Sequence, residues 1–364
     1  MSLVTSFDIK NIVCLFFYDL KDTINLYNLN KDHQDNIMIT NLYDVETKYK
    51  NRLNQKIIRQ HKYKYMKKLY IYNRGKIKNV SHLKKTLEEL YCDYNIRIDQ
   101  NGISELNLIK LYSTNNQKIK NVNHMKKTLK ILDCSYYSGI DQNGISELNL
   151  IELYVFDNKK IKNVNHMKKT LKILNCGGYF CGIDQSGISE LNLIELNTIG
   201  NERIKNVNHM KKTLKKLNCS DDSGIDQNGI SELNLIELYA SGNKKIKNVN
   251  HMKETLKILN CSWGSGIDQN GISELNLIEL NGLCNEKITI IPFNNMTNHN
   301  KNNKIISFDD MINHNKNNKI ISFDNFDNVI NHNKNNKIIS FDDVTHHNKN
   351  NEIIKLEKWY CLIL

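Results

Sequence analysis

Apolar residues recur through the middle of the chain in a fixed frame that predicts a stack of short strands. The frame reads Leu-x-x-Leu-x-apolar, and its first residue returns every 21 residues, except for one step of 22 residues. A unit this short supplies one strand and cannot bury its own apolar face, so neighbouring units must stack to make a core. The first apolar residues of the units are Met66, Leu87, Leu108, Leu129, Leu150, Leu171, Leu193, Leu214, Leu235, Leu256 and Leu277.

One unit shows the complete frame. Leu150, Leu153, Val155 and Asn158 form its first half, and apolar residues spaced by three follow over 161–167. This frame resembles that of the leucine-rich-repeat family. The resemblance implies an α/β solenoid of about eleven 21-residue coils over 66–291, with short parallel strands on the concave face and 3₁₀-like turns on the back. Glycines after Asn or Ser are expected to form tight turns at Gly102, Gly144, Gly187, Gly229 and Gly271.

Two phrases alternate along these coils, so the full repeat spans 42 or 43 residues. One is basic (KIKNVNHMKKTLKIL) and the other is acidic (GIDQNGISELNLIEL). Stacking places them side by side, which predicts ion pairs between coils. The acidic coils also interrupt any continuous basic stripe, and this counts against binding of nucleic acid.

Repeated Cys and His residues invite a metal or catalytic interpretation, which the spacing opposes. Each occurs in every second coil, so equivalent side chains should lie roughly 10 Å apart, too far for a disulfide or a shared metal. We therefore expect the cysteines to be buried small apolar residues and the histidines to form a solvated surface row. The residues are Cys92, Cys134, Cys176, Cys219 and Cys261, and His82, His124, His166, His209 and His251.

The residues between the core leucines should point outward from the concave face. Tyr is frequent there in the N-terminal coils, and exposed Tyr is a common contact residue in protein interfaces. The alternative is that Tyr simply suits strands. The predicted partner-binding residues are Tyr70, Tyr72, Tyr91, Tyr112, Tyr154, Phe156 and Tyr239.

Composition changes this picture little. The net charge of +12 comes with a general excess of Asn, Lys and Ile, so it is weak support for a polyanionic partner. No segment is apolar enough to span a membrane, and the N-terminus lacks the features of a signal peptide. Nine cysteines is an odd number, and in a chain without a secretory signal this predicts reduced thiols. We therefore expect a cytoplasmic protein that is not secreted. Recognisable catalytic and cofactor motifs are missing, so we expect no enzyme activity, no cofactor and no metal.

The N-terminal segment 1–40 resembles a degenerate F-box, the motif that docks a substrate receptor onto a Skp-type adaptor. It has an apolar and aromatic run over 12–18, but it lacks the usual Leu-Pro opening and a later Trp. The alternative is a small helical cap over the open end of the solenoid. Residues 41–65 should form a bridging helix. The resemblance implies that the adaptor-binding residues are Ile12, Leu15, Phe16, Leu20, Ile24 and Leu29.

Residues 292–364 depart from the frame into low-complexity Asn/Lys/Ile repeats, expected to be partly ordered or disordered, whose IISF segments could add edge strands. Together these features are similar to the F-box/leucine-rich-repeat proteins of amoebal giant viruses, which would place the chain in host cytoplasm. The resulting hypothesis is a protein-binding module on the concave face, as substrate receptor of a cullin-type ubiquitin ligase. The alternative is a structural scaffold with no role in ubiquitination.

Overall fold

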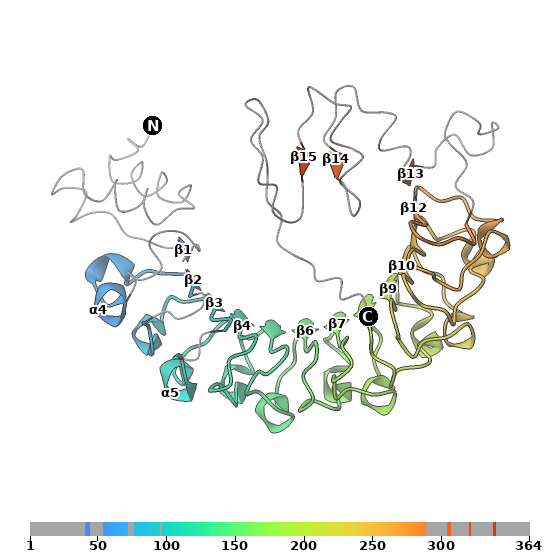
Figure 1. The fold of residues 1–364 in the computed structure, drawn as a ribbon. Helices are drawn as coiled ribbons and strands as arrows, with labels where there is room; N and C mark the ends of the chain where they lie inside the picture. Colours follow the sequence, from blue (N-terminus) through green and yellow to red (C-terminus); the bar gives the residue numbers. More distant parts are fainter. Residues whose placement is uncertain are drawn as a thin grey trace, which may run out of the picture.

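The chain folds into an arc of stacked coils in the computed structural model, with strands along the inner side and helical turns outside (Figure 1). The structure describes residues 41–43, 54–71, 76–94, 97–288, 304–306, 320–321 and 338–339. The predicted leucine-rich-repeat-like solenoid is confirmed, with eleven regular coils carrying β2 to β12.

All strands of the main sheet are parallel and follow one another in chain order, thirteen in number. Each spans three residues, and its central apolar residue pairs with the central residue of the next strand, as Leu132 does with Leu153. The strands are β1 (Asn41–Tyr43), β2 (Lys68–Tyr70), β3 (Glu89–Tyr91), β4 (Lys110–Tyr112), β5 (Ile131–Asp133), β6 (Glu152–Tyr154), β7 (Ile173–Asn175), β8 (Glu195–Asn197), β9 (Lys216–Asn218), β10 (Glu237–Tyr239), β11 (Ile258–Asn260), β12 (Glu279–Asn281) and β13 (Lys304–Ile306).

Short helical turns form the back of the coils, as the spacing over 161–167 predicted. The turn buries Ile161, Val164 and Met167 completely, so these apolar side chains, rather than intrinsic helix propensity, stabilise it. The turns are α4 (Gln55–Ile58), η1 (His61–Tyr63), η2 (Ser81–Leu83), α5 (Gln100–Ile103), η3 (Asn123–Met125), η4 (Asn143–Ile145), η5 (Asn165–Met167), η6 (Ser186–Ile188), η7 (Asn208–Met210), η8 (Asn228–Ile230), η9 (Asn250–Met252) and η10 (Asn270–Ile272).

A ladder of buried asparagines joins every second coil to the coil before it. The side-chain nitrogen of Asn158 donates to the carbonyl oxygens of Cys134 and Ile140, at 2.7 and 3.2 Å, and its oxygen accepts the N–H of Lys160 at 2.9 Å. These bonds satisfy backbone groups that the turn leaves without partners inside the solenoid. The other members are Asn116, Asn201, Asn243 and Asn285.

The repeated glycines have a different role from the tight turns we expected. Gly144 lies in η4 and is buried, and it is absent from the positive-φ residues of the chain. A Cβ atom there would lie 2.1 Å from the carbonyl oxygen of Lys120 in the preceding coil. Glycine is therefore required by close approach of neighbouring coils.

At both ends of the solenoid a further strand pairs with the sheet. Of residues 41–65, where we predicted one bridging helix, the structure describes strand β1, the four-residue helix α4 and the turn η1. Strand β1 pairs with β2 in register, so it extends the sheet by one coil. At the other end the KII segment forms β13 against β12, and two similar segments form the pair β14 (Ile320–Ile321) and β15 (Ile338–Ile339). The F-box-like residues 12–29 lie outside the described residues.

Candidate interaction surfaces of the solenoid

Most repeated polar side chains on the back are used to hold the coils together. The Gln142 side chain accepts the N–H groups of Lys162 and Asn163 and donates to the carbonyl of Asn163 at 2.8 Å. Asn165 similarly donates to the carbonyl of Ser186 and accepts the N–H of Glu190. These residues recur almost unchanged in each repeat, and their bonds give a structural reason for it.

The predicted ion pairs between coils are confirmed on the same side. Both partners are about half exposed, so each pair contributes only about 0–1 kcal/mol. The pairs are Lys84–Glu105, Lys126–Glu147, Lys168–Glu190, Lys211–Glu232 and Lys253–Glu274.

The histidine row is exposed, as expected, but each ring is also anchored. In His166 the Nε2 atom lies 3.2 Å from the carbonyl oxygen of Ile145 in the preceding coil, so this nitrogen carries the donated proton. Partial burial lowers the pKa of His82, His124, His166 and His209, and the carbonyl contact opposes this effect. The row therefore links coils rather than forming a free set of ligands.

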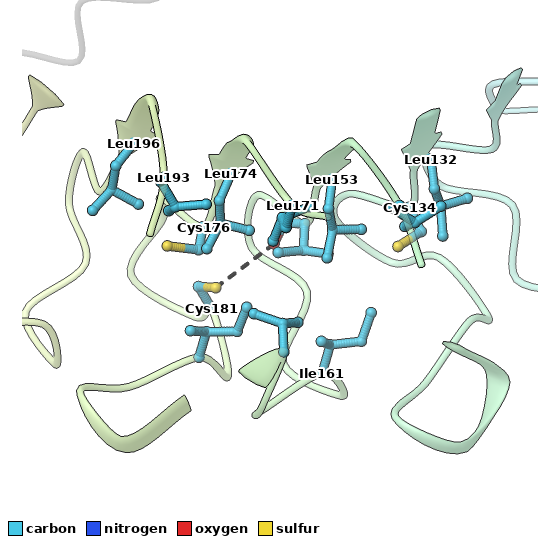
Figure 2. Close-up of a cluster of buried hydrophobic side chains, with 14 of the residues drawn as sticks. Leu132, Cys134, Leu153, Ile161, Leu171, Leu174, Cys176, Cys181, Leu193 and Leu196 are labelled. Atoms are coloured by element: carbon cyan, nitrogen blue, oxygen red, sulfur yellow. Dashed lines mark hydrogen bonds between the residues drawn. The ribbon is translucent and has the colours of Figure 1, made fainter. Parts of the chain in front are cut away.

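The repeated cysteines point into the core, as predicted (Figure 2). Cys134 and Cys176 are fully buried beside core leucines, in the strand-adjacent position that Val155 fills in the coil between them. Burial raises the pKa of both thiols. A further buried cysteine, Cys181, has its Sγ atom 3.7 Å from the carbonyl oxygen of Val155. These thiols pack as small apolar groups.

Five predicted tyrosines form what we name the tyrosine row, which occupies the last position of its strands on the concave side: Tyr70, Tyr91, Tyr112, Tyr154 and Tyr239. The rings of Tyr70 and Tyr91 stack at 3.7 Å between centroids, and those of Tyr91 and Tyr112 at 4.3 Å. The hydroxyl of Tyr154 donates to Glu152 at 2.9 Å, and that of Tyr239 to Glu237 at 3.1 Å. All five are intermediate in exposure, so they form a preordered surface rather than freely projecting rings.

Two aspartates lie in or beside this row: Asp133 takes the tyrosine position in β5, between Tyr112 and Tyr154, and Asp93 lies two residues after Tyr91. Asp93 accepts the N–H of Thr114 at 2.8 Å, and Asp133 accepts the N–H of Ser135 at 3.0 Å. Burial raises the pKa of Asp93 to about 6, and the nearby charge of Asp133 acts in the same direction. Of the two other predicted contact residues, Phe156 packs against Tyr136 with 5.3 Å between the ring centroids, and Tyr72 lies outside the described residues.

An isoleucine row, which sequence reasoning missed, runs along the edge where the strands begin. It consists of equivalent residues in every second coil: Ile109 (41% exposed), Ile151 (43%), Ile194 (48%), Ile236 (44%) and Ile278 (56%). The Leu-x-x-Leu frame leaves these positions unspecified, and because they lie between two core leucines their side chains face outward.

The opposite edge, where the strands end, carries a second surface that sequence reasoning missed. We name it the exit rim and define it as the turns after the strands, residues 93–94, 114–115, 135–137, 156–157, 177–180, 199–200, 220–222, 241–242 and 262–264. Six of its aromatic side chains are exposed: Tyr94 (44%), Tyr136 (40%), Tyr137 (70%), Tyr179 (59%), Phe180 (70%) and Trp263 (48%). A usable signal was present, because these turns vary in sequence while the rest of each repeat barely changes.

No group of three or more His, Cys, Asp or Glu side chains among the described residues is close enough to hold a metal ion. Within the same ranges, no helix is both long and apolar enough to cross a membrane.

No protein family matches the chain, and no curated protein does. Among solved structures, a chain in "Crystal structure of Rad7 and Elc1 complex in yeast" is 15% identical, with a TM-score of 0.40. That alignment covers 83% of this chain and 92% of the other.

Proposed function

We propose that this chain is a non-enzymatic protein-binding module that uses the concave side of its solenoid. The observation that carries the proposal is the division of the repeat into constant and variable positions. Constant residues such as Gln142, Asn165 and His166 hold neighbouring coils together. The last strand position instead varies among Tyr, Asp and Asn, and the turn after it varies more. Variation confined to one exposed face of a rigid scaffold suits recognition.

The tyrosine row is the best candidate for the centre of the interface. Stacked rings and tethered hydroxyls lose little conformational freedom on binding, which favours affinity. Ion pairs along the strands neutralise nearby lysines: Lys68 and Lys110 both contact Glu89, at 3.2 and 3.3 Å. The surface thus combines apolar rings with paired charges, and this supports a protein partner over a polyanion.

Affinity purification of the intact chain, followed by mass spectrometry, tests the proposal. We expect Tyr91→Ala with Tyr112→Ala to remove a partner that the unchanged chain retains. The matched control is Tyr65→Ala, because Tyr65 is 48% exposed but lies in the turn before β2 rather than on the concave face. Purified partner should then bind the control and the unchanged chain equally.

Two other outcomes would redirect the interpretation. If every partner survives the double substitution, the chain acts as a structural scaffold and the tyrosine row is ordinary strand packing. If binding falls steeply with salt and nuclease removes it, the chain binds nucleic acid.

The role of substrate receptor in a ubiquitin ligase remains a proposal that the sequence of segment 1–40 alone supports. We propose that a Skp-type adaptor binds Ile12, Leu15, Phe16, Leu20, Ile24 and Leu29. Purified adaptor should bind the full chain and lose binding after Leu15→Asp with Phe16→Asp, whereas Tyr112→Ala should leave it unchanged. Absence of binding by the unchanged full chain would remove the ubiquitin part and leave the binding module standing.

A further inference from the structure

The exit rim is a continuous, ordered ledge. The N–H of Tyr136 donates to the carbonyl of Phe156 at 2.6 Å, and that of Asp157 donates to the carbonyl of Gly177 at 3.0 Å. Such turn-to-turn bonds recur through the remaining coils up to Trp263 and Gly264, whose N–H groups donate to the carbonyls of Leu283 and Cys284 at 2.8 and 3.0 Å. The side chains of this rim are therefore held at about the 4.8 Å spacing of neighbouring strands.

Three of the rim aromatics stand where their backbone conformation is unfavourable. Tyr94, Tyr136 and Trp263 have φ angles of 54°, 57° and 52°, in the left-handed region. Gly200 and Gly242 occupy the same position in other coils, where glycine adopts this conformation freely. A large side chain costs roughly 1–2 kcal/mol there, so the turn itself does not call for an aromatic residue. Exposed rings kept at a conformational cost point to a use outside the fold.

The rim is also acidic in a basic chain. Its residues include four aspartates (Asp93, Asp157, Asp221 and Asp222) and no lysine or arginine, whereas the whole chain has a net charge of +12. Lysines follow further along the turns. The ammonium groups of Lys160 and Lys245 donate to the carbonyls of Ser138 and Ser223, at 2.8 and 2.9 Å, whereas Lys159 and Lys244 beside them are exposed.

Aspartates and rings lie together along the ledge. The hydroxyl of Tyr179 is 3.3 Å from a carboxylate oxygen of Asp222, two coils away, and a carboxylate oxygen of Asp157 accepts the N–H of Phe180 at 3.0 Å. Burial raises the pKa of Asp221, and the adjacent charge of Asp222 adds to this. A cation brought to this pair would relieve the repulsion between them.

We propose that the exit rim binds an extended, lysine- or arginine-rich segment of a protein partner. Cationic side chains would lie over the exposed faces of Tyr137, Tyr179 and Trp263 and pair with the rim aspartates. An extended segment running across the coils would meet exposed rings at Tyr94, at Tyr136 and Tyr137, at Tyr179 and Phe180, and at Trp263. It would meet the carboxylates of Asp221 and Asp222 in the alternate coil between the last two. The inference rests on the proposed protein-binding function and names the chemistry of the partner.

Fluorescence anisotropy with labelled 12-residue peptides tests the inference on the full chain. A peptide of alternating Lys and Ser should bind, with affinity falling as salt rises, and a peptide of alternating Glu and Ser should not. The triple variant Asp157→Asn, Asp221→Asn and Asp222→Asn should lower the affinity for the Lys peptide at least tenfold. Tyr137→Ser with Phe180→Ser, which changes no charge, should lower that affinity severalfold.

Ile236→Ser on the isoleucine row provides the matched control and should leave peptide affinity unchanged. A urea transition for each variant separates loss of binding from loss of fold. The inference is overturned if the Glu peptide binds as tightly as the Lys peptide, or if the rim variants bind the Lys peptide like the unchanged chain. It is also overturned if the only effect of the rim variants is to abolish association between copies of this chain. If the Lys peptide does not bind while binding of a purified partner still requires Tyr91 and Tyr112, the proposed function stands and the inference is wrong.

Discussion

Replacement of Asn201 by Ala should destabilise the solenoid strongly, because one side chain satisfies three backbone groups. Asn201 is 1% exposed, its nitrogen donates to the carbonyls of Cys176 and Ile183 at 2.8 and 3.0 Å, and its oxygen accepts the N–H of Arg203 at 3.0 Å. A buried group left without a partner costs about 1–3 kcal/mol. Arg203 is exposed, so water recovers part of its loss. We expect a loss of about 3–5 kcal/mol in the free energy of unfolding.

The assay is urea unfolding followed by far-ultraviolet circular dichroism, on the full chain and two variants. Asn206→Ala is the matched control, since Asn206 is exposed and its oxygen accepts one bond, from the N–H of Asn208 at 3.0 Å. The free energy of unfolding should fall by less than about 1 kcal/mol in this variant. Because each coil contacts only its neighbours, Asn201→Ala should also broaden the transition or split it in two. Equal losses for the two variants would refute the account of the asparagine ladder.

Three further outcomes follow from the packing and burial of single residues. Gly187→Ala places a Cβ atom 2.1 Å from the carbonyl oxygen of Lys162, so urea unfolding should show a loss above about 2 kcal/mol, against about 1 kcal/mol for Gly264→Ala, where the added atom meets nothing within 4 Å. With the cysteines at positions 14 and 361 replaced by serine, a thiol reagent should label Cys284 rapidly and the six buried cysteines only on unfolding, and rapid labelling of more than one thiol would contradict the burial. The pKa of Asp93 is raised in the folded chain, so its charged form is disfavoured: Asp93→Asn should raise the urea midpoint at pH 7.5, and the gain should shrink as pH falls through about 6 and vanish below about 4.

The regular part of the fold could be predicted from the sequence because one frame repeats eleven times. Once Leu132 and Leu153 are placed in the core, the outward position of Tyr154 and the inward position of Cys134 follow from the two-residue period of a strand. The register between coils follows as well, because equivalent residues must pair.

Features that depend on distances between coils could not be predicted in the same way. The frame places Gly144 in a turn but does not reveal that the carbonyl of Lys120 approaches it. The link from His166 to the Ile145 carbonyl is hidden for the same reason, and the sequence shows only a recurring histidine. The exit rim was missed because aromatic residues such as Tyr179 and Trp263 lie in turns that have no periodicity of their own.

The alternation of basic and acidic coils has a consequence for how this chain can change length. The basic coil bonds the acidic coil after it through Asn123, which donates to the carbonyl of Asn143 and accepts the N–H of Glu147, and through the Lys126–Glu147 ion pair. Removal of a single coil would place like coils together and break these contacts. A pair of coils can be excised cleanly: loss of residues 129–170 joins Thr128 to Leu171, and every remaining contact type has its counterpart. The solenoid is thus modular in units of two coils. Its length, and with it the length of partner that it can contact, can be shortened or extended by two coils at a time without the design of a new junction.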